Sequence, residues 1–199
     1  MFSLKILMNA LFALLLFQAF MILSRPDDPL LEYYSLAQIF TGNTDELLLI
    51  LVGMILIVVY WVQNNKQLAN LKRSSGTRAA LAVSQMFALM IYLYFMRFDM
   101  EFEGLEIALY MQRVFLAPAG FIGVFNWVYA RRNDLTLDRI DDAEEKYRFF
   151  QLPPEPSAAL FSLAFAGYGP EVWILSFLIV IPLSVICTRL GKRIWPHIG

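Results

Sequence analysis

Residues 47–63 read LLLILVGMILIVVYWVQ, and this apolar run decides the fold class. It contains no Asp, Glu, Lys, Arg or His, and Tyr60-Trp61 near its end is an aromatic pair typical of the border between lipid and water. A helix needs about 20 such residues to cross hydrocarbon about 30 Å thick. The run therefore predicts a helix that crosses a membrane.

Five further segments are apolar enough to be candidate membrane spans, and most are also about long enough. They cover residues 6–23, 79–96, 107–130, 157–166 and 172–188. Pro118 predicts a bend in the segment at 107–130, and the segment at 157–166 is short, so it is expected to begin earlier or to be shielded by protein. The sequence thus predicts an all-α, multi-pass membrane protein with six transmembrane helices in one domain, residues 1–199. Five spans is the alternative.

The composition supports this class and excludes others. Apolar residues make up 59% of the 199 residues and charged residues 17%, whereas soluble domains average roughly 45–50% and about 25%. A net charge of −1 offers no basic field to a nucleic acid. Cys187 and His197 are the only residues of their types, which rules out an intramolecular disulfide and a Cys/His metal cluster. We expect no metal, no cofactor and no nucleic-acid partner.

Basic residues are sorted along the chain. With six spans and a cytoplasmic N-terminus, the outer segments hold only Arg25 and Arg97, and Arg113 lies within a span. Basic residues accumulate on the cytoplasmic side of membrane proteins, so both termini are predicted to be cytoplasmic, and so is a linker at residues 131–156 with a short helix at 137–150. The inner segments hold Lys5, Lys66, Lys72, Arg73, Arg78, Arg131, Arg132, Arg139, Lys146, Arg148, Arg189, Lys192 and Arg193.

The first apolar segment is expected to remain in the protein. It is longer than the 7–15 apolar residues usual in a signal peptide, and no small-x-small cleavage site follows it. Cleavage is the alternative. We expect a multi-pass protein of a bacterial plasma membrane or another inner membrane.

The chain contains none of the common catalytic motifs, such as H-E-x-x-H, G-x-S-x-G or Walker A, so no catalytic residue is assigned and the protein is not expected to be an enzyme. Arg113 is the strongest single candidate for a functional residue, because a charge inside a membrane span costs free energy and marks a functional site by default. It either reaches outward toward the acidic loop at 99–106 or serves a permeation path or anion site. Gln112, Gln85 and Ser84 are candidate partners for hydrogen bonds between helices.

The first segment carries few polar residues. Asn9 and Gln18 are nine residues apart, which places them on opposite faces of a helix. Leu14, Phe17 and Met21 form an apolar stripe, which packs on a neighbouring helix or lipid, or forms a hydrophobic pore constriction that gates by dewetting. In the fourth segment, the small residues Ala117, Ala119, Gly120 and Gly123 allow close helix approach.

Residues 61–65 read WVQNN, residues 10–16 read ALFALLL after Asn9, and residues 108–110 read ALY. Together with the six spans and the short last hairpin, these stretches resemble the endolysosomal and bacterial potassium-channel family. In that family the first helix carries R-x-x-x-F-S-D before a small residue and an apolar run, and the second span ends W-x-x-H-H. The resemblance implies a homotetramer whose first helices line a pore for monovalent cations.

The resemblance also assigns roles to residues. Leu14 would form the pore constriction, with Phe17 and Met21 further along. The positions of the family's polar network, which holds the pore helix, are occupied here by Asn9, Trp61, Asn64 and Asn65.

The sequence departs from the signature in its charged groups. Leu7-Met8-Asn9 stands where the family has F-S-D, and Asn64-Asn65 stands where it has two histidines. Lys5 is the nearest basic residue to the expected arginine. The network would therefore be neutral.

Two functions remain open on the sequence. The first is a cation channel or leak subunit of the potassium type, with a hydrophobic constriction on the first helix. The second is a non-conducting accessory subunit of a larger membrane complex, since the titratable groups of the signature are absent. A small transporter with Arg113 as its anion site rests on one residue.

Overall fold

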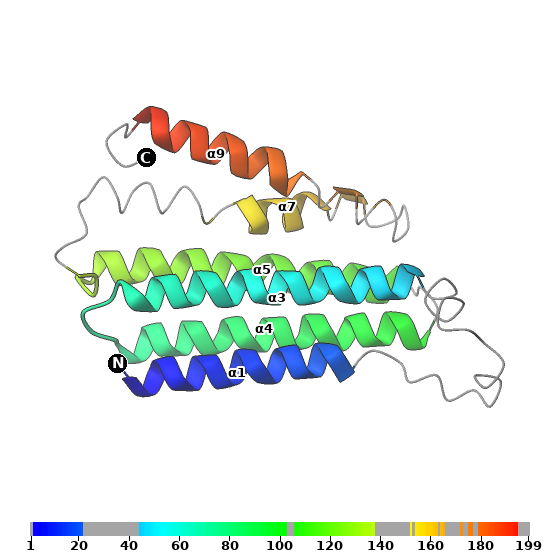
Figure 1. The fold of residues 1–199 in the computed structure, drawn as a ribbon, viewed down its shortest axis with the longest axis horizontal. Coiled ribbons are helices and arrows are strands. Elements are labelled where there is room, and N and C mark those ends of the chain that lie inside the picture. The colour runs from blue at the N-terminus through cyan, green and yellow to red at the C-terminus, as the bar shows by residue number, and fades with distance from the viewer. Residues whose placement is uncertain are drawn as a thin grey trace.

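The structure is a computed structural model that describes residues 2–21, 44–102, 106–137, 152, 154–162, 164–165, 172, 175–176 and 179–194. Its main helices are α1 (Phe2–Met21), α3 (Thr44–Ala69), α4 (Gly76–Glu101), α5 (Glu106–Arg132), α7 (Pro154–Ser162) and α9 (Val180–Ile194) (Figure 1). Within these ranges the only β-type pairing is an isolated antiparallel bridge between Leu71 and Thr136. The all-α class is thus confirmed for the part of the chain that the structure describes.

Helices α1, α3, α4 and α5 lie alongside one another as a bundle (Figure 1). Helices α1 and α4 begin at the end of the bundle where α3 and α5 finish. The α4–α5 pair has the most extensive interface, α7 packs on α5, and α9 packs on α7. The core draws buried apolar side chains from all four bundle helices, among them Met8, Phe12, Leu15, Ile57, Tyr60, Met86, Leu89, Tyr92, Met96 and Leu116.

Among the described residues, three helices are long and apolar enough to cross a membrane. They are α1, over Leu4–Met21, α4 and α5. This is consistent with a membrane protein. The six-span count and the cytoplasmic termini stay predictions.

The observed helices differ from the predicted segments mainly at their ends. The segments at 47–63, 79–96 and 107–130 lie inside α3, α4 and α5, each of which extends beyond its segment at both ends. Helix α1 starts at Phe2, ahead of the predicted segment, and residues 22–23 lie outside the described residues. Apolar composition marks where lipid could surround a helix, whereas backbone hydrogen bonds continue through the polar residues that flank it.

Helix α7 begins at Pro154, ahead of the segment predicted at 157–166, and ends at Ser162. The last predicted segment, 172–188, overlaps α9, which runs on past its basic residues to Ile194. Pro118 lies inside α5, which continues through it. The predicted linker helix at 137–150 lies almost wholly outside the described residues, and Leu137, its first residue, is not helical.

The turn between α3 and α4 is tied to the segment that follows α5. Lys72 donates its backbone N–H to the Leu135 carbonyl at 2.9 Å, and Leu137 donates to the Asn70 carbonyl at 2.9 Å. The Lys72 Nζ lies 3.0 Å from the Asp134 carboxylate. Asp134 has a positive φ of 52°, which reverses the chain after α5. These bonds close one end of the bundle.

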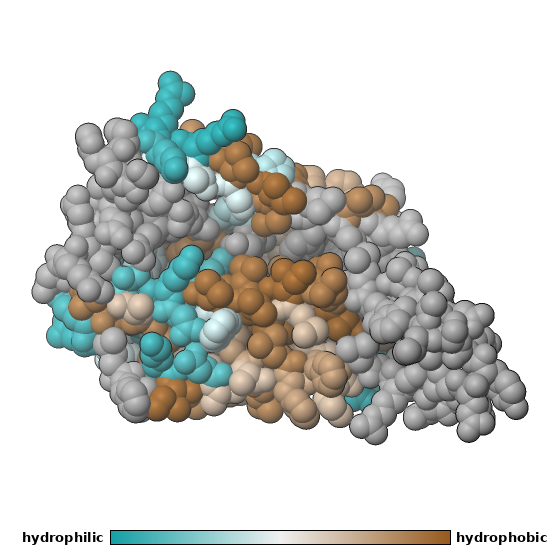
Figure 2. Space-filling view, in the orientation of Figure 1, coloured by the Kyte–Doolittle hydropathy of each residue, from teal (hydrophilic) through white to brown (hydrophobic). Residues whose placement is uncertain are grey.

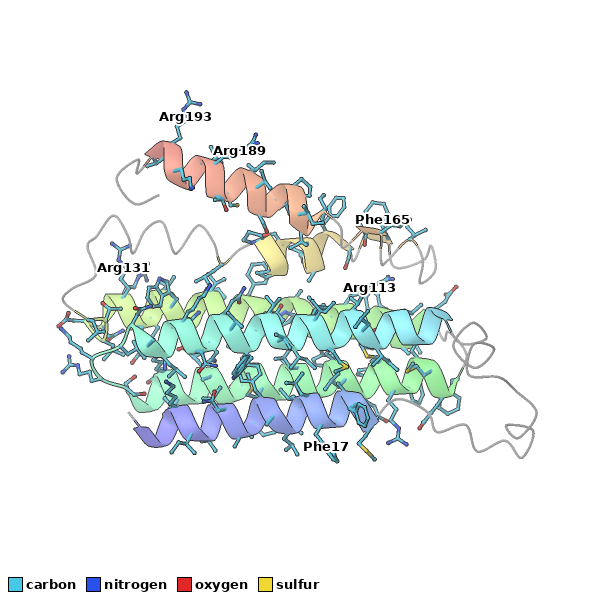
Figure 3. All side chains as sticks on the ribbon, in the orientation of Figure 1. Phe17, Arg113, Arg131, Phe165, Arg189 and Arg193 are labelled. Atoms are coloured by element: carbon cyan, nitrogen blue, oxygen red, sulfur yellow. The ribbon has the colours of Figure 1, made fainter. Side chains whose placement is uncertain are left out.

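Polar and apolar side chains are separated along the bundle axis. In the view of Figure 2, hydrophobic residues cover the middle of the bundle, and hydrophilic residues gather at the end where α5 finishes. Arg131, Arg189 and Arg193 lie toward this end, whereas Arg113 lies in the opposite half (Figure 3). The separation follows from the sorting of charge in the sequence.

Candidate functional site

Helix α1 turns one face to the bundle. Met8, Phe12, Leu15 and Ala19 are buried on this face, spaced four, three and four residues apart as helix geometry requires. They contribute to the same core as residues of α3 and α4. This face anchors α1 and fixes which of its residues point away.

The predicted constriction residues lie on the opposite face of α1. Leu14, Phe17 and Met21 are 53%, 61% and 59% exposed, and Phe17 points away from the bundle in Figure 3. Ile6 and Leu7 are about half exposed on the same side. Helix α1 therefore presents an apolar surface that no described part of the chain covers.

The structure brings part of the predicted polar group together. The Trp61 indole Nε1 donates a hydrogen bond of 3.0 Å to the Asn9 Oδ1, which joins α3 to α1. The Asn65 Nδ2 donates to the Trp61 carbonyl at 3.2 Å, inside α3. Asn64 is buried apart from them, and its amide has no hydrogen-bond partner among the described residues.

Asn9 and Gln18 lie on opposite edges of α1, as the sequence predicts. Asn9 contacts α3 through Trp61, whereas Gln18 lines a groove shared with α4. The exposed apolar face lies between these two edges.

Arg113 is fully buried in α5, and the acidic residue nearest to it is the first of the predicted acidic stretch at 99–106. Its acidic neighbour is Asp99, which belongs to α4 and is itself 5% exposed, and the two charges attract each other. Gln112, predicted to bond between helices, donates from Nε2 to Asp99 Oδ2 at 3.3 Å and to the Phe95 carbonyl at 3.4 Å. Helix α4 runs past its predicted end to Glu101, so Asp99 belongs to a helix and lies beside Gln112 and Arg113 at the α4–α5 interface.

The small residues of α5 allow close approach, as predicted. A Cβ added at Gly120 would lie 2.6 Å from the Pro156 Cβ of α7 and 2.9 Å from the Tyr60 hydroxyl of α3. A Cβ added at Gly123 would lie 2.9 Å from Nε2 of Gln85. The Gly123 carbonyl also accepts a hydrogen bond of 3.1 Å from Gln67 Nε2. Ser84, the other predicted partner, is exposed.

Arg78, predicted to lie in the inner segment just before the apolar residues 79–96, is part of a helix. Arg78 lies in α4 and is fully buried, and its guanidinium has no hydrogen-bond partner among the described residues. Asn126, also fully buried, was not singled out. A signal was available, since Arg78 shares the spacing of Ala82, Gln85 and Leu89 on the buried face of α4.

In the described ranges no three His, Cys, Asp or Glu side chains form a group that could hold a metal ion. No protein-family model and no curated protein matches the chain.

Proposed function

We propose that the chain is one subunit of a homotetrameric membrane channel for monovalent cations of the potassium type. In this proposal six spans place both termini in the cytoplasm, and the α1 helices of four copies surround the pore. The observation that carries it is the apolar, exposed face of α1, with Leu14, Phe17 and Met21 along it.

The packing of the single chain supports a pore between copies. Large apolar side chains of all four bundle helices fill the interior, among them Phe12, Ile57, Tyr92 and Leu116. Ions need a polar or water-filled path, which a close-packed apolar core does not offer. A conducting path is therefore expected where α1 meets other copies.

The hydrogen bond between Trp61 and Asn9 supports a fixed orientation of α1. Asn9 lies at the edge of the exposed face, so this bond limits rotation of α1 about its axis. A constriction of Leu14 side chains requires such a limit, because a turn of one residue, about 100°, would replace Leu14 by a neighbour. Apolar rings of this kind control conduction through pore width and dewetting.

The proposal is tested by potassium flux into liposomes that contain the purified protein. Leu14→Ala and Phe17→Ala widen the pore, so flux is expected to rise above the wild-type rate. Phe125→Ala is the matched control: Phe125 is 62% exposed but lies on α5, so its flux stays at the wild-type rate. Absence of flux above empty vesicles for the wild type and both α1 variants would overturn the proposal.

A non-conducting accessory subunit is the second candidate. The amide of Asn9, which joins α1 to α3 through Trp61, favours it, because a neutral polar group can hold helices together without a titratable group. Purification in mild detergent separates the two candidates: a homotetramer supports the channel, and a foreign subunit in fixed proportion supports the accessory role.

A further inference from the structure

A groove lies between α1 and α4, near the C-terminal ends of both helices. Its volume is about 430 Å³, and its lining includes Gln18 and Met21 from α1 and Tyr94, Arg97, Phe98 and Glu101 from α4. The groove is separate from the Trp61–Asn9 contact, which lies on the other edge of α1. It adjoins the exposed face of α1, since Met21 belongs to both.

One end of the groove carries a positive and a negative side chain, Arg97 and Glu101. The Arg97 Nε lies 2.7 Å from Glu101 Oε1, and the two side chains are 65% and 50% exposed. Exposed pairs four residues apart on a helix contribute little to stability, so a ligand with charges of both signs displaces this contact at small cost.

The wall of the groove is aromatic. The rings of Tyr94 and Phe98 stack with centroids 6.3 Å apart, and the rings of Phe98 and Phe102 lie 4.5 Å apart. Aromatic side chains with a polar tip, such as Tyr94, suit the boundary between hydrocarbon and headgroups. An apolar chain along these rings and a charged group at Arg97 and Glu101 would each meet a matching surface.

From this geometry we propose that the groove binds a phospholipid with a zwitterionic headgroup that carries a primary amine. The phosphate lies at Arg97, the ammonium group lies at Glu101, and one acyl chain lies against Phe98 and Met21. The inference rests on α1 and α4 crossing a bilayer, which their length and composition allow, and not on ion conduction.

The charges select among lipid classes. An ammonium group offers three N–H donors to the Glu101 carboxylate, whereas the quaternary ammonium of phosphatidylcholine has none. An anionic glycerol headgroup supplies the phosphate for Arg97 but no cation for Glu101. Phosphatidylethanolamine is therefore the best match among these three headgroups.

Native mass spectrometry of the delipidated, detergent-purified full chain tests the inference, with phosphatidylethanolamine, phosphatidylcholine and phosphatidylglycerol of identical acyl chains as probes. The wild type is expected to retain about two- to five-fold more phosphatidylethanolamine than phosphatidylcholine, the ratio that one partly exposed charge pair supplies. Glu101→Gln removes this preference. Arg97→Gln lowers retention of all three lipids, because each has a phosphate.

Glu106→Gln is the matched control, since Glu106 is an exposed carboxylate at the start of α5 and does not line the groove. It is expected to keep the wild-type preference. Equal retention of the ethanolamine and choline lipids by the wild type would overturn the inference, as would a preference that survives Glu101→Gln. If Arg97→Gln and Glu101→Gln change the oligomeric state and not the lipid retained, a second copy occupies the groove and the inference fails. This measurement needs no conduction, so it stands or falls separately from the liposome flux.

Discussion

The α4–α5 interface and the outer face of α1 differ in what they bury. Between α4 and α5 the described structure contains Asp99, Gln112 and Arg113, all buried, and Gly123, which brings the α5 backbone close to the Gln85 side chain. The outer face of α1 is apolar and exposed, and the Trp61–Asn9 hydrogen bond holds one edge of this helix. Substitutions at the first region should therefore change stability, and substitutions at the second should change what happens between copies.

The largest expected effect comes from the buried charges. Arg113→Leu leaves the Asp99 carboxylate buried without its cation, and is expected to lower the free energy of unfolding by about 3–5 kcal/mol. Asp99→Leu acts in the same direction, and the double variant loses less than the sum of the two. Denaturant unfolding of the purified protein in detergent gives these values. Arg73→Ala is the exposed control and is expected to change the free energy of unfolding by no more than about 0.5 kcal/mol. If Arg113→Leu or Asp99→Leu costs as little as this control, the two buried charges do not stabilise each other.

The next effect concerns close backbone approach in α5. Gly120→Ala places a methyl group against Pro156 and the Tyr60 hydroxyl, so we expect a loss of about 1–3 kcal/mol in the same unfolding measurement. Gly76→Ala is the control, because a Cβ there meets no atom within 4 Å. It is expected to be neutral or to stabilise by up to about 1 kcal/mol. Equal effects of the two substitutions would show that α7 does not pack on α5 at this point.

A smaller effect on the free energy of unfolding is expected at the Trp61–Asn9 hydrogen bond, which joins α1 to α3. A double-mutant cycle with Asn9→Ala and Trp61→Phe should give a coupling free energy of about 0.6 kcal/mol, the average for hydrogen bonds between membrane helices. The cycle subtracts the cost of each substitution by itself. A coupling free energy of zero would mean that Trp61 does not hold Asn9, and the fixed orientation of α1 would lose its support.

The smallest effect is expected on the exposed face of α1. Phe17→Ala should change the free energy of unfolding by no more than about 0.5 kcal/mol, because its side chain leaves no cavity in the bundle. Phe12→Ala, five residues earlier on the buried face, is expected to cost about 3–5 kcal/mol. If Phe17→Ala costs as much as Phe12→Ala, α1 is rotated from the orientation described here.

Helical segments were predictable from the sequence because apolar runs such as residues 47–63 are long and free of charge. The ends were less predictable. Asp99 looked like the start of an acidic loop, yet it lies in the last turns of α4 and faces α5. Composition cannot reveal this, because Asp99 becomes acceptable inside the bundle only when Gln112 and Arg113 lie beside it.

The candidate site was predictable in part. The spacing of Leu14, Phe17 and Met21 placed these three residues on one face of the first helix without deciding whether that face packs or stays uncovered, and the W-x-x-N-N stretch singled out Trp61. The sequence could not say which of Asn9, Asn64 and Asn65 the indole would meet. That depends on the crossing of α1 and α3, which brings Asn9 to Trp61 and leaves Asn64 buried elsewhere.

The sequence by itself determined an all-helical chain with helices apolar enough for a membrane and with basic residues sorted apart from acidic ones, because hydropathy and charge are local properties of residues. Only the tertiary structure decided which face of α1 is left uncovered, that Arg78 and Arg113 are buried, and that α1 and α4 form a groove with Arg97 and Glu101 at its charged end. These features depend on how helices pack, and packing is set by the combined shape of side chains far apart in the chain.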